Sequence, residues 1–111
     1  MRRLSLLSFV AAAACHSPSS YCQAVLDTTC ERLFACATGA ERAALELQFA
    51  DAAACSRAMG TRAQCAGQTE ASFCVGRKWN GSKAATCLDE LKATSCASLS
   101  TYRPTCAPPC Q

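Results

Sequence analysis

The chain has little of what a catalytic site ordinarily requires. It contains one histidine, His16, among 111 residues. A nucleophilic serine or cysteine is usually activated by a neighbouring histidine, so a single histidine argues against both kinds of catalysis. Glycine-rich phosphate loops are missing, and the adjacent Asp89 and Glu90 would point about 100° apart on a helix rather than converge as an acid/base pair. The sequence therefore predicts a protein that is not an enzyme.

Close cysteine pairs are absent as well. The tightest spacing is Cys106-x3-Cys110, and the other consecutive cysteines are separated by five to eighteen residues. Thiolate metal sites and thiol–disulfide exchange motifs favour C-x-x-C pairs, and one histidine nearly excludes mixed cysteine–histidine zinc sites. We therefore expect no metal and no cofactor.

Long apolar runs and a large net charge are also missing. The longest run of apolar and small residues, 4–14, would form a helix of about 16 Å, too short for the roughly 30 Å core of a bilayer. The formal net charge is +3, and loss of Arg2 and Arg3 with a cleaved signal would leave nine basic and eight acidic side chains. Such a mixed surface lacks the electrostatic footprint of a nucleic-acid-binding protein, so no nucleic-acid partner is expected.

Cysteine, in contrast, is abundant, with eleven in the chain. A cysteine content of about 10% is typical of short exported disulfide scaffolds, because a reducing cytosol would leave the thiols open. Since eleven is an odd number, one cysteine needs a separate explanation, and Cys15 directly follows the N-terminal apolar segment. The other ten are expected to form five disulfides whose connectivity the sequence leaves open. These ten are Cys22, Cys30, Cys36, Cys55, Cys65, Cys74, Cys87, Cys96, Cys106 and Cys110.

Residues 1–14 have the organisation of a signal peptide. Arg2 and Arg3 form a positive region, 4–10 an apolar region and 11–14 a small-residue cleavage region. Such a segment predicts an exported protein.

The segment Phe9-Val-Ala-Ala-Ala-Ala-Cys15 resembles the lipobox of bacterial lipoproteins, with Ala12 where leucine is usual. The resemblance implies that Cys15 receives a diacylglycerol and anchors the mature chain in a membrane. The uncharged His16 after it is compatible with outer-membrane sorting. The alternative is ordinary signal-peptidase cleavage after Ala13 or Ala14, which leaves an odd number of cysteines in the mature protein. Beyond residue 15 the chain is similar only in general to small cysteine-rich exported proteins of high-GC Gram-negative bacteria.

We expect a short polar tether at 15–20 and one cysteine-rich helical domain at 21–111. Capping boxes and glycine or proline stops predict helices near 21–37, 39–59, 62–75 and 83–98. The capping boxes are Ser20 with Gln23, Thr38 with Glu41 and Thr61 with Gln64; Gly60 and Gly76 are the expected stops, and Ser82 or Thr86 begins the last helix. The predicted fold is all-α: a small disulfide-stapled bundle of about four helices with an irregular tail at 99–111 that contains Cys106 and Cys110.

Alanine explains why disulfides matter here. It is the best helix former but buries little apolar area, so the core of such a small domain would be thin. Helix 21–37 is expected to turn one apolar face inward. That face comprises Cys22, Val25, Leu26, Thr29, Cys30, Leu33 and Cys36.

One segment suggests surface recognition. Arg77, Lys78 and Trp79 precede the turn-forming pair Asn80-Gly81, and an aromatic ring beside cations is a plausible contact site. The competing interpretation, which we favour, is that Trp79 folds back over the core while Arg77 and Lys78 remain in water.

These features predict a membrane-anchored bacterial lipoprotein of the cell envelope, most simply the outer membrane. It would be a non-catalytic binding or structural module for an unidentified protein or glycan partner. A freely secreted effector, inhibitor or toxin-like protein, periplasmic or extracellular, is the alternative. A periplasmic enzyme or redox protein is the third possibility considered.

Overall fold

The computed structural model describes residues 16–111, so the predictions of a signal peptide at 1–14 and of lipidation at Cys15 lie outside the described residues. Within the described range the fold is all-α and stapled by disulfides, as predicted. The α-helices are α1 (Pro18–Cys36), α2 (Gly39–Gln48), α3 (Ala52–Arg62), α4 (Glu70–Phe73) and α5 (Gly81–Ala93), with 3₁₀ helices η2 (Cys65–Gly67) and η3 (Cys96–Thr101). None of the helices in 16–111 is long and apolar enough to cross a membrane.

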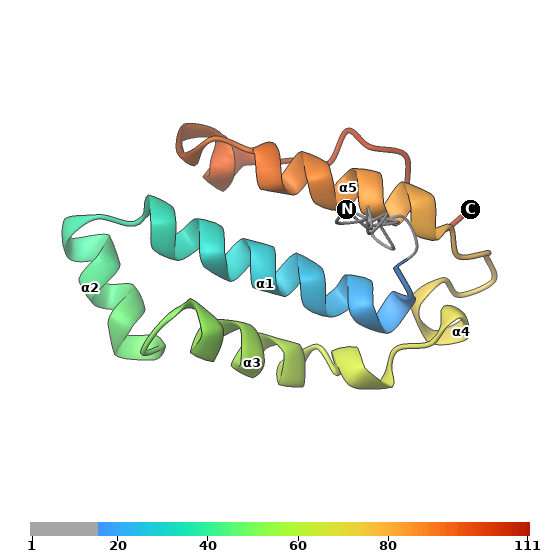
Figure 1. Ribbon diagram of the computed structural model, residues 1–111, viewed down its shortest axis with the longest axis horizontal. Helices are drawn as coiled ribbons and strands as arrows, with labels where there is room; N and C mark the ends of the chain where they lie inside the picture. Colours follow the sequence, from blue (N-terminus) through green and yellow to red (C-terminus); the bar gives the residue numbers. More distant parts are fainter. Residues whose placement is uncertain (1–15) are drawn as a thin grey trace, which may run out of the picture.

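Helix α1 is the centre of the fold, because it packs against both α3 and α5 (Figure 1). Helix α3 returns antiparallel along one side of α1, and α5 runs along the other side in the same direction as α1. Helix α2 connects α1 to α3 at one end, whereas α4 lies at the opposite end, near the start of α1. The chain ends beside that same end after a tail that runs back along α5.

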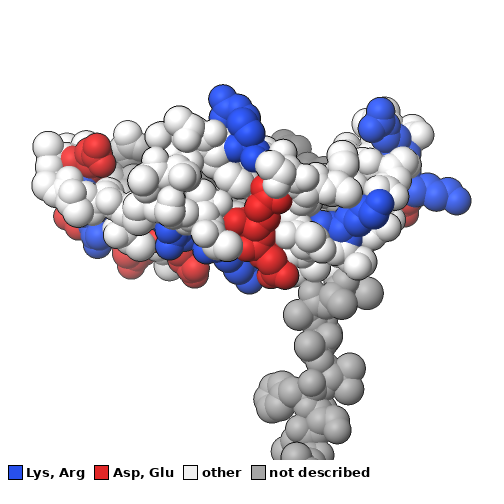
Figure 2. Space-filling view, turned by 90° about the horizontal axis from the view of Figure 1, so that it is seen from above, with Lys and Arg blue, Asp and Glu red and all other residues white. Residues whose placement is uncertain are grey.

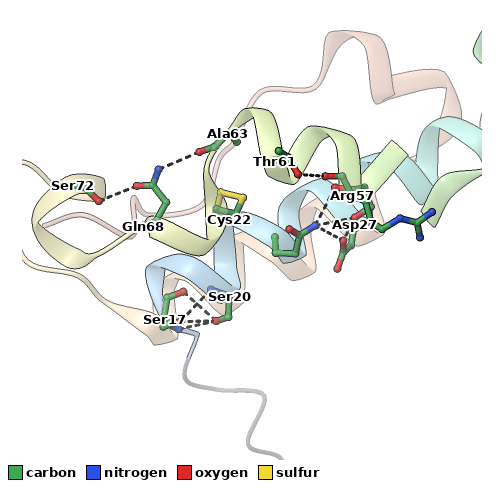
Figure 3. Close-up of a disulfide and its surroundings, with 12 residues drawn as sticks. Ser17, Ser20, Cys22, Asp27, Arg57, Thr61, Ala63, Gln68 and Ser72 are labelled. Carbon is green, nitrogen blue, oxygen red and sulfur yellow. Dashed lines mark hydrogen bonds between the residues drawn. A yellow bond between two sulfur atoms is a disulfide. The ribbon is translucent and has the colours of Figure 1, made fainter. Parts of the chain in front are cut away.

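Helix α1 begins earlier than predicted. Ser17 is its N-cap and Pro18 its first residue, a position where proline's missing N–H and fixed φ are well suited. The Ser17 N–H donates to Ser20 Oγ at 2.9 Å, and the Ser20 N–H donates to Ser17 Oγ at 3.1 Å (Figure 3). The expected tether at 15–20 is therefore wrong for 17–20, which forms the cap and first turn of α1, and the capping box is Ser17 with Ser20.

The helix predicted at 39–59 is two helices. Asp51 caps α3 by accepting the Ala54 N–H at 2.8 Å, which gives the backbone an alternative to continuing α2. Phe49 follows α2 at this break, and with Leu45 it packs against the buried cluster of Cys30, Phe34 and Cys55. Thr38 does cap α2 by position, but its side chain makes no capping hydrogen bond.

Gly60 was predicted to end a helix. It lies instead inside α3, where it is buried. A Cβ at this position would lie 2.2 Å from Oε1 of Gln23 on α1. The glycine is therefore needed for close approach of the Gln23 side chain, not for a left-handed backbone.

The predicted helix at 62–75 is largely absent. Gln64 has φ +54°, a left-handed conformation that prevents the helix from continuing after α3. Thr61 and Gln64 therefore form no capping box. Only η2 and the four-residue α4 follow, and α4 is capped by Thr69 with Ser72. Gly76, with φ +71°, then turns the chain toward α5.

The last helix is shifted relative to its prediction. Asn80, rather than Ser82 or Thr86, caps α5 by accepting the Lys83 N–H at 3.0 Å. The helix ends at Ala93, and Ser95 caps the separate 3₁₀ helix η3. The tail after η3 is irregular, with one isolated β-bridge between Trp79 and Cys110.

Because α1 lies between two helices, it does not present one apolar face to one core. Its buried residues are Thr28, Cys30 and Phe34, whereas Leu33, expected inside, is 39% exposed. Arg32 points toward the end of α5, where its Nη2 donates to the Thr94 carbonyl at 2.6 Å. The single-face prediction for this helix is therefore wrong.

The core contains more sulphur than large hydrocarbon side chains. Five of the nine buried hydrophobic residues in the described range are cysteines. The nine are Cys30, Phe34, Cys55, Cys65, Cys74, Ala84, Cys87, Leu88 and Leu91. Half-buried Leu45, Phe49, Ala52 and Met59 pack around Cys30, Phe34 and Cys55. The disulfides therefore fill the interior as well as crosslink it.

All ten cysteines of the described range are paired, with Cα–Cα distances between 5.2 and 5.9 Å. Three bridges leave α1, to η2, to α3 and to η3, and two bind the C-terminal tail. The pairs are Cys22–Cys65, Cys30–Cys55, Cys36–Cys96, Cys74–Cys110 and Cys87–Cys106. Five disulfides indicate an oxidising, extracytoplasmic environment.

Burial predicts the order in which these bridges open. Cys30 and Cys55 are 1% and 2% exposed, whereas Cys96 lies on the surface. A reductant must reach a sulphur atom, so Cys36–Cys96 should be reduced first under native conditions and Cys30–Cys55 only when the fold opens. Partial reduction, alkylation and peptide mapping measure this order. Early loss of Cys30–Cys55 would contradict it.

Candidate functional site

An apolar groove lies between α1, α5 and the C-terminal tail. Its volume is about 440 Å³, within the range of small-molecule and side-chain pockets. Its walls are Tyr21 and Val25 of α1, Leu91 and the Cys87–Cys106 bridge of α5, and Tyr102, Pro104, Pro108 and Pro109 of the tail. The prolines supply apolar surface with no backbone N–H to satisfy, which suits a wall made of irregular chain.

The tail wall is fixed to the helices at several points. Glu90 of α5 accepts the Thr105 N–H at 2.8 Å and the Tyr102 hydroxyl at 3.1 Å. Farther along, the Asn80 N–H donates to the Pro109 carbonyl at 2.7 Å. Together with the Cys87–Cys106 bridge, these contacts fix the position of the tail wall relative to α5.

Electrostatics keep the polar groups of this wall in defined protonation states. The Thr105 N–H, helped by the Tyr102 hydroxyl, lowers the pKa of Glu90 against a smaller opposing effect of desolvation. Burial raises the pKa of Tyr102, and the hydrogen bond to the Glu90 carboxylate raises it further. Burial also raises the pKa of Tyr21. At neutral pH the phenols of Tyr21 and Tyr102 are therefore protonated. The ionised Glu90 carboxylate accepts hydrogen bonds from Tyr102 and Thr105 of the tail.

A second, more polar hollow lies between α1 and α3, lined by Gln23, Asp27, Glu31 and Arg57 among others. Gln23 Nε2 donates to Asp27 Oδ1 at 2.9 Å and to Ser56 Oγ at 3.0 Å. Ser56 Oγ in turn donates to Asp27, which is labelled in Figure 3. These groups satisfy one another, and Ser56 is buried. The network therefore joins α1 to α3 and leaves little hydrogen-bonding capacity for a ligand.

The Ser56–Asp27 pair also lacks a histidine to act as a base. His16 lies at the start of α1, where its carbonyl accepts the Trp79 indole N–H at 2.7 Å. In the chain between 16 and 111 no group of three or more histidine, cysteine, aspartate or glutamate side chains is placed to hold a metal ion.

The structure separates the three residues of the predicted contact segment. The Trp79 ring is half-buried against Tyr21 and Phe73, with ring centroids 5.5 and 5.3 Å away. Arg77 and Lys78 are exposed. Trp79 thus folds back over the helices, while the two cations remain available at the surface.

The groove itself was not predicted from the sequence. Its residues come from α1, α5 and a tail expected only to be irregular, and no spacing in the chain reveals that Tyr21 and Pro109 meet. The available signal was the concentration of Pro104, Pro108 and Pro109 around Cys106 and Cys110, which marks a tail that is both stiff and tied down.

Comparison of the chain with protein-family models, with curated proteins and with solved structures found no match to any of them.

Glu90 predicts a pH dependence of the groove wall. Because its pKa is lower in the fold than in the unfolded chain, its carboxylate stabilises the fold above the ordinary glutamate pKa. This contribution is lost as the pH falls through the lower folded-state value. Acidification should therefore lower the protection factor of the Thr105 amide, which is the intrinsic exchange rate at each pH divided by the observed rate, and Glu90→Gln should lower it already at neutral pH. Asp89→Asn, one residue away and exposed, is the control; equal effects of the two substitutions would contradict the assignment.

Proposed function

We propose that the chain is a bacterial lipoprotein of the cell envelope, anchored in the outer membrane through a lipid on Cys15. It acts as a non-catalytic binding module. The observation that carries the anchor is the pairing of the other cysteines. Every cysteine from Cys22 to Cys110 has its partner inside the domain, so none of them remains for a bridge to Cys15. The lipobox-like segment before Cys15 supplies the modification that accounts for the odd thiol.

The binding site in this proposal is the apolar groove. Its tail wall is fixed to α5 by Glu90 and the Cys87–Cys106 bridge, it is lined mostly by apolar residues, and the Tyr21 and Tyr102 rings form part of its wall. An apolar groove of this size favours an aliphatic or aromatic side chain of a protein partner, because burial of that side chain removes apolar surface from water. The Tyr21 phenol supplies a polar group at the same site.

The anchor predicts the mass and the location of the processed protein. Expressed with its own signal in a Gram-negative host, the mature chain should begin at a diacylglyceryl-modified Cys15 and gain ten hydrogens on reduction. It should resist extraction by high salt and dissolve in detergent. Cys15→Ser should release the chain into the soluble periplasmic fraction with five intact bridges, and Ser19→Ala should leave retention unchanged. A wild-type chain that is soluble and unmodified would support free secretion instead.

The groove predicts binding of an apolar probe. An anilinonaphthalene dye should bind the soluble Cys15→Ser chain, and Val25→Asp should weaken binding by about tenfold or more, because an unpaired carboxylate in an apolar site costs over about 1.4 kcal/mol. Pro108→Asp tests the opposite wall at an exposed residue. Val75→Asp, at a valine that is 80% exposed and outside the groove, is the matched control. Unchanged binding in both groove variants, with native circular dichroism, would exclude this site.

A further inference from the structure

The first described residue is fixed to the body of the domain. The His16 carbonyl accepts the Trp79 indole N–H at 2.7 Å, and α1 begins only two residues later. Consecutive Cα atoms are about 3.8 Å apart, so Cys15 lies within one residue of this contact. Residues 17–20 are helix rather than tether. A lipid on Cys15 would therefore hold the Trp79 end of the domain directly at the bilayer.

That end carries an exposed turn with the side chains of an interfacial segment. Val75 is 80% exposed, and Gly76 has φ +71°. Arg77 and Lys78 follow, both exposed. Figure 2 shows basic side chains projecting at the end of the molecule that carries α4 in Figure 1.

The turn is held rigidly in place. The Arg77 N–H donates to the Cys74 carbonyl at 2.8 Å, and Lys78 exchanges two backbone hydrogen bonds of 2.9 Å with Gln111. The Cys74–Cys110 bridge closes the same region. The nearby Glu70 carboxylate accepts the backbone N–H of Trp79 at 3.1 Å. This carboxylate is therefore engaged by the backbone next to the turn. Within residues 16–111, the side chains of Arg77 and Lys78 form no hydrogen bond or salt bridge, and the Val75 side chain is exposed.

We propose that residues 75–78 form a membrane-contact turn on a bilayer that contains anionic phospholipids. This proposal rests on the lipid anchor at Cys15. Val75 enters the headgroup region, and Arg77 and Lys78 bind lipid phosphates. Trp79 lies behind the turn, a position typical of an aromatic residue at a membrane interface. The anchor and the turn together fix one orientation of the domain, with the far ends of α1 and α5 directed away from the membrane.

The lysines report this orientation. Lys78 is in the turn, whereas Lys92 lies in the last turn of α5, at the far end. The lipidated full chain is reconstituted in vesicles of phosphatidylethanolamine and phosphatidylglycerol and briefly acetylated, and each lysine is quantified by mass spectrometry. Its rate is compared with that of the same lysine in the soluble Cys15→Ser chain. Lys78 should be acetylated several-fold more slowly on vesicles, and Lys92 at an unchanged rate.

A pair of double variants separates the turn from the anchor. Val75→Glu with Arg77→Glu keeps Lys78 as the reporter and should restore its acetylation to nearly the soluble rate, because both contacts of its neighbours are removed. Leu47→Glu with Arg57→Glu makes the same chemical changes at exposed positions on α2 and α3 and should leave Lys78 protected. Unaltered protection in the turn variant would overturn the role of the turn.

The outcomes also separate this inference from the anchor. A wild-type chain retained on vesicles after a salt wash, with Lys78 and Lys92 acetylated at their soluble rates, would overturn the orientation and leave the anchor intact. Release of the chain by salt would overturn the anchor and the orientation that rests on it. Protection of Lys92 with free Lys78 would show the opposite orientation.

Discussion

The fold depends on crosslinking α1 to its neighbours along its whole length. Cys22, Cys30 and Cys36 occupy the start, middle and end of this helix, and each is bridged to a different segment. Each bridge restricts the unfolded chain, a contribution of about 2–4 kcal/mol. The buried pair Cys30–Cys55 also occupies the centre of the cluster that Phe34, Leu45 and Phe49 complete. An alanine-rich chain thus obtains from sulphur both the crosslinks and part of the interior volume that larger side chains supply elsewhere.

Much of this architecture was predictable, and the failures have physical reasons. Helical class and disulfide use follow from composition, and the structure confirms both. The positions of the breaks did not follow, because several residues could serve as caps and the sequence does not show which of them do: Asp51 and Asn80 accept backbone N–H groups and begin helices that the predicted caps placed elsewhere. Gly60 was misjudged because its role depends on Gln23, a residue of another helix. Such long-range contacts are invisible to a pattern read along one segment.

The candidate groove shows the same division. Its chemistry could have been anticipated from tyrosine and proline content, but its location could not, because it exists only where the tail is folded against α1 and α5. Glu90 is the residue that joins the two, since one carboxylate binds both the Tyr102 phenol and the Thr105 amide. A carboxylate that was considered from the sequence only as half of an acid/base pair thus positions one wall of an apolar site.

The connectivity of the disulfides has a consequence for biogenesis. No bridge joins two cysteines that are consecutive in the chain: Cys30–Cys55 is enclosed by Cys22–Cys65, and Cys36–Cys96 crosses the bridges that hold the tail. A chain oxidised pairwise as it emerges from a translocon would first link Cys22 to Cys30, and then Cys36 to Cys55, and none of its bridges would be native. Thiol–disulfide exchange proceeds by attack of a thiolate on an existing bridge and is slow without a catalyst. Any bridge formed in the order of emergence must therefore be exchanged before the nested and crossed native pairs can form, and a catalyst of thiol–disulfide exchange would speed this step.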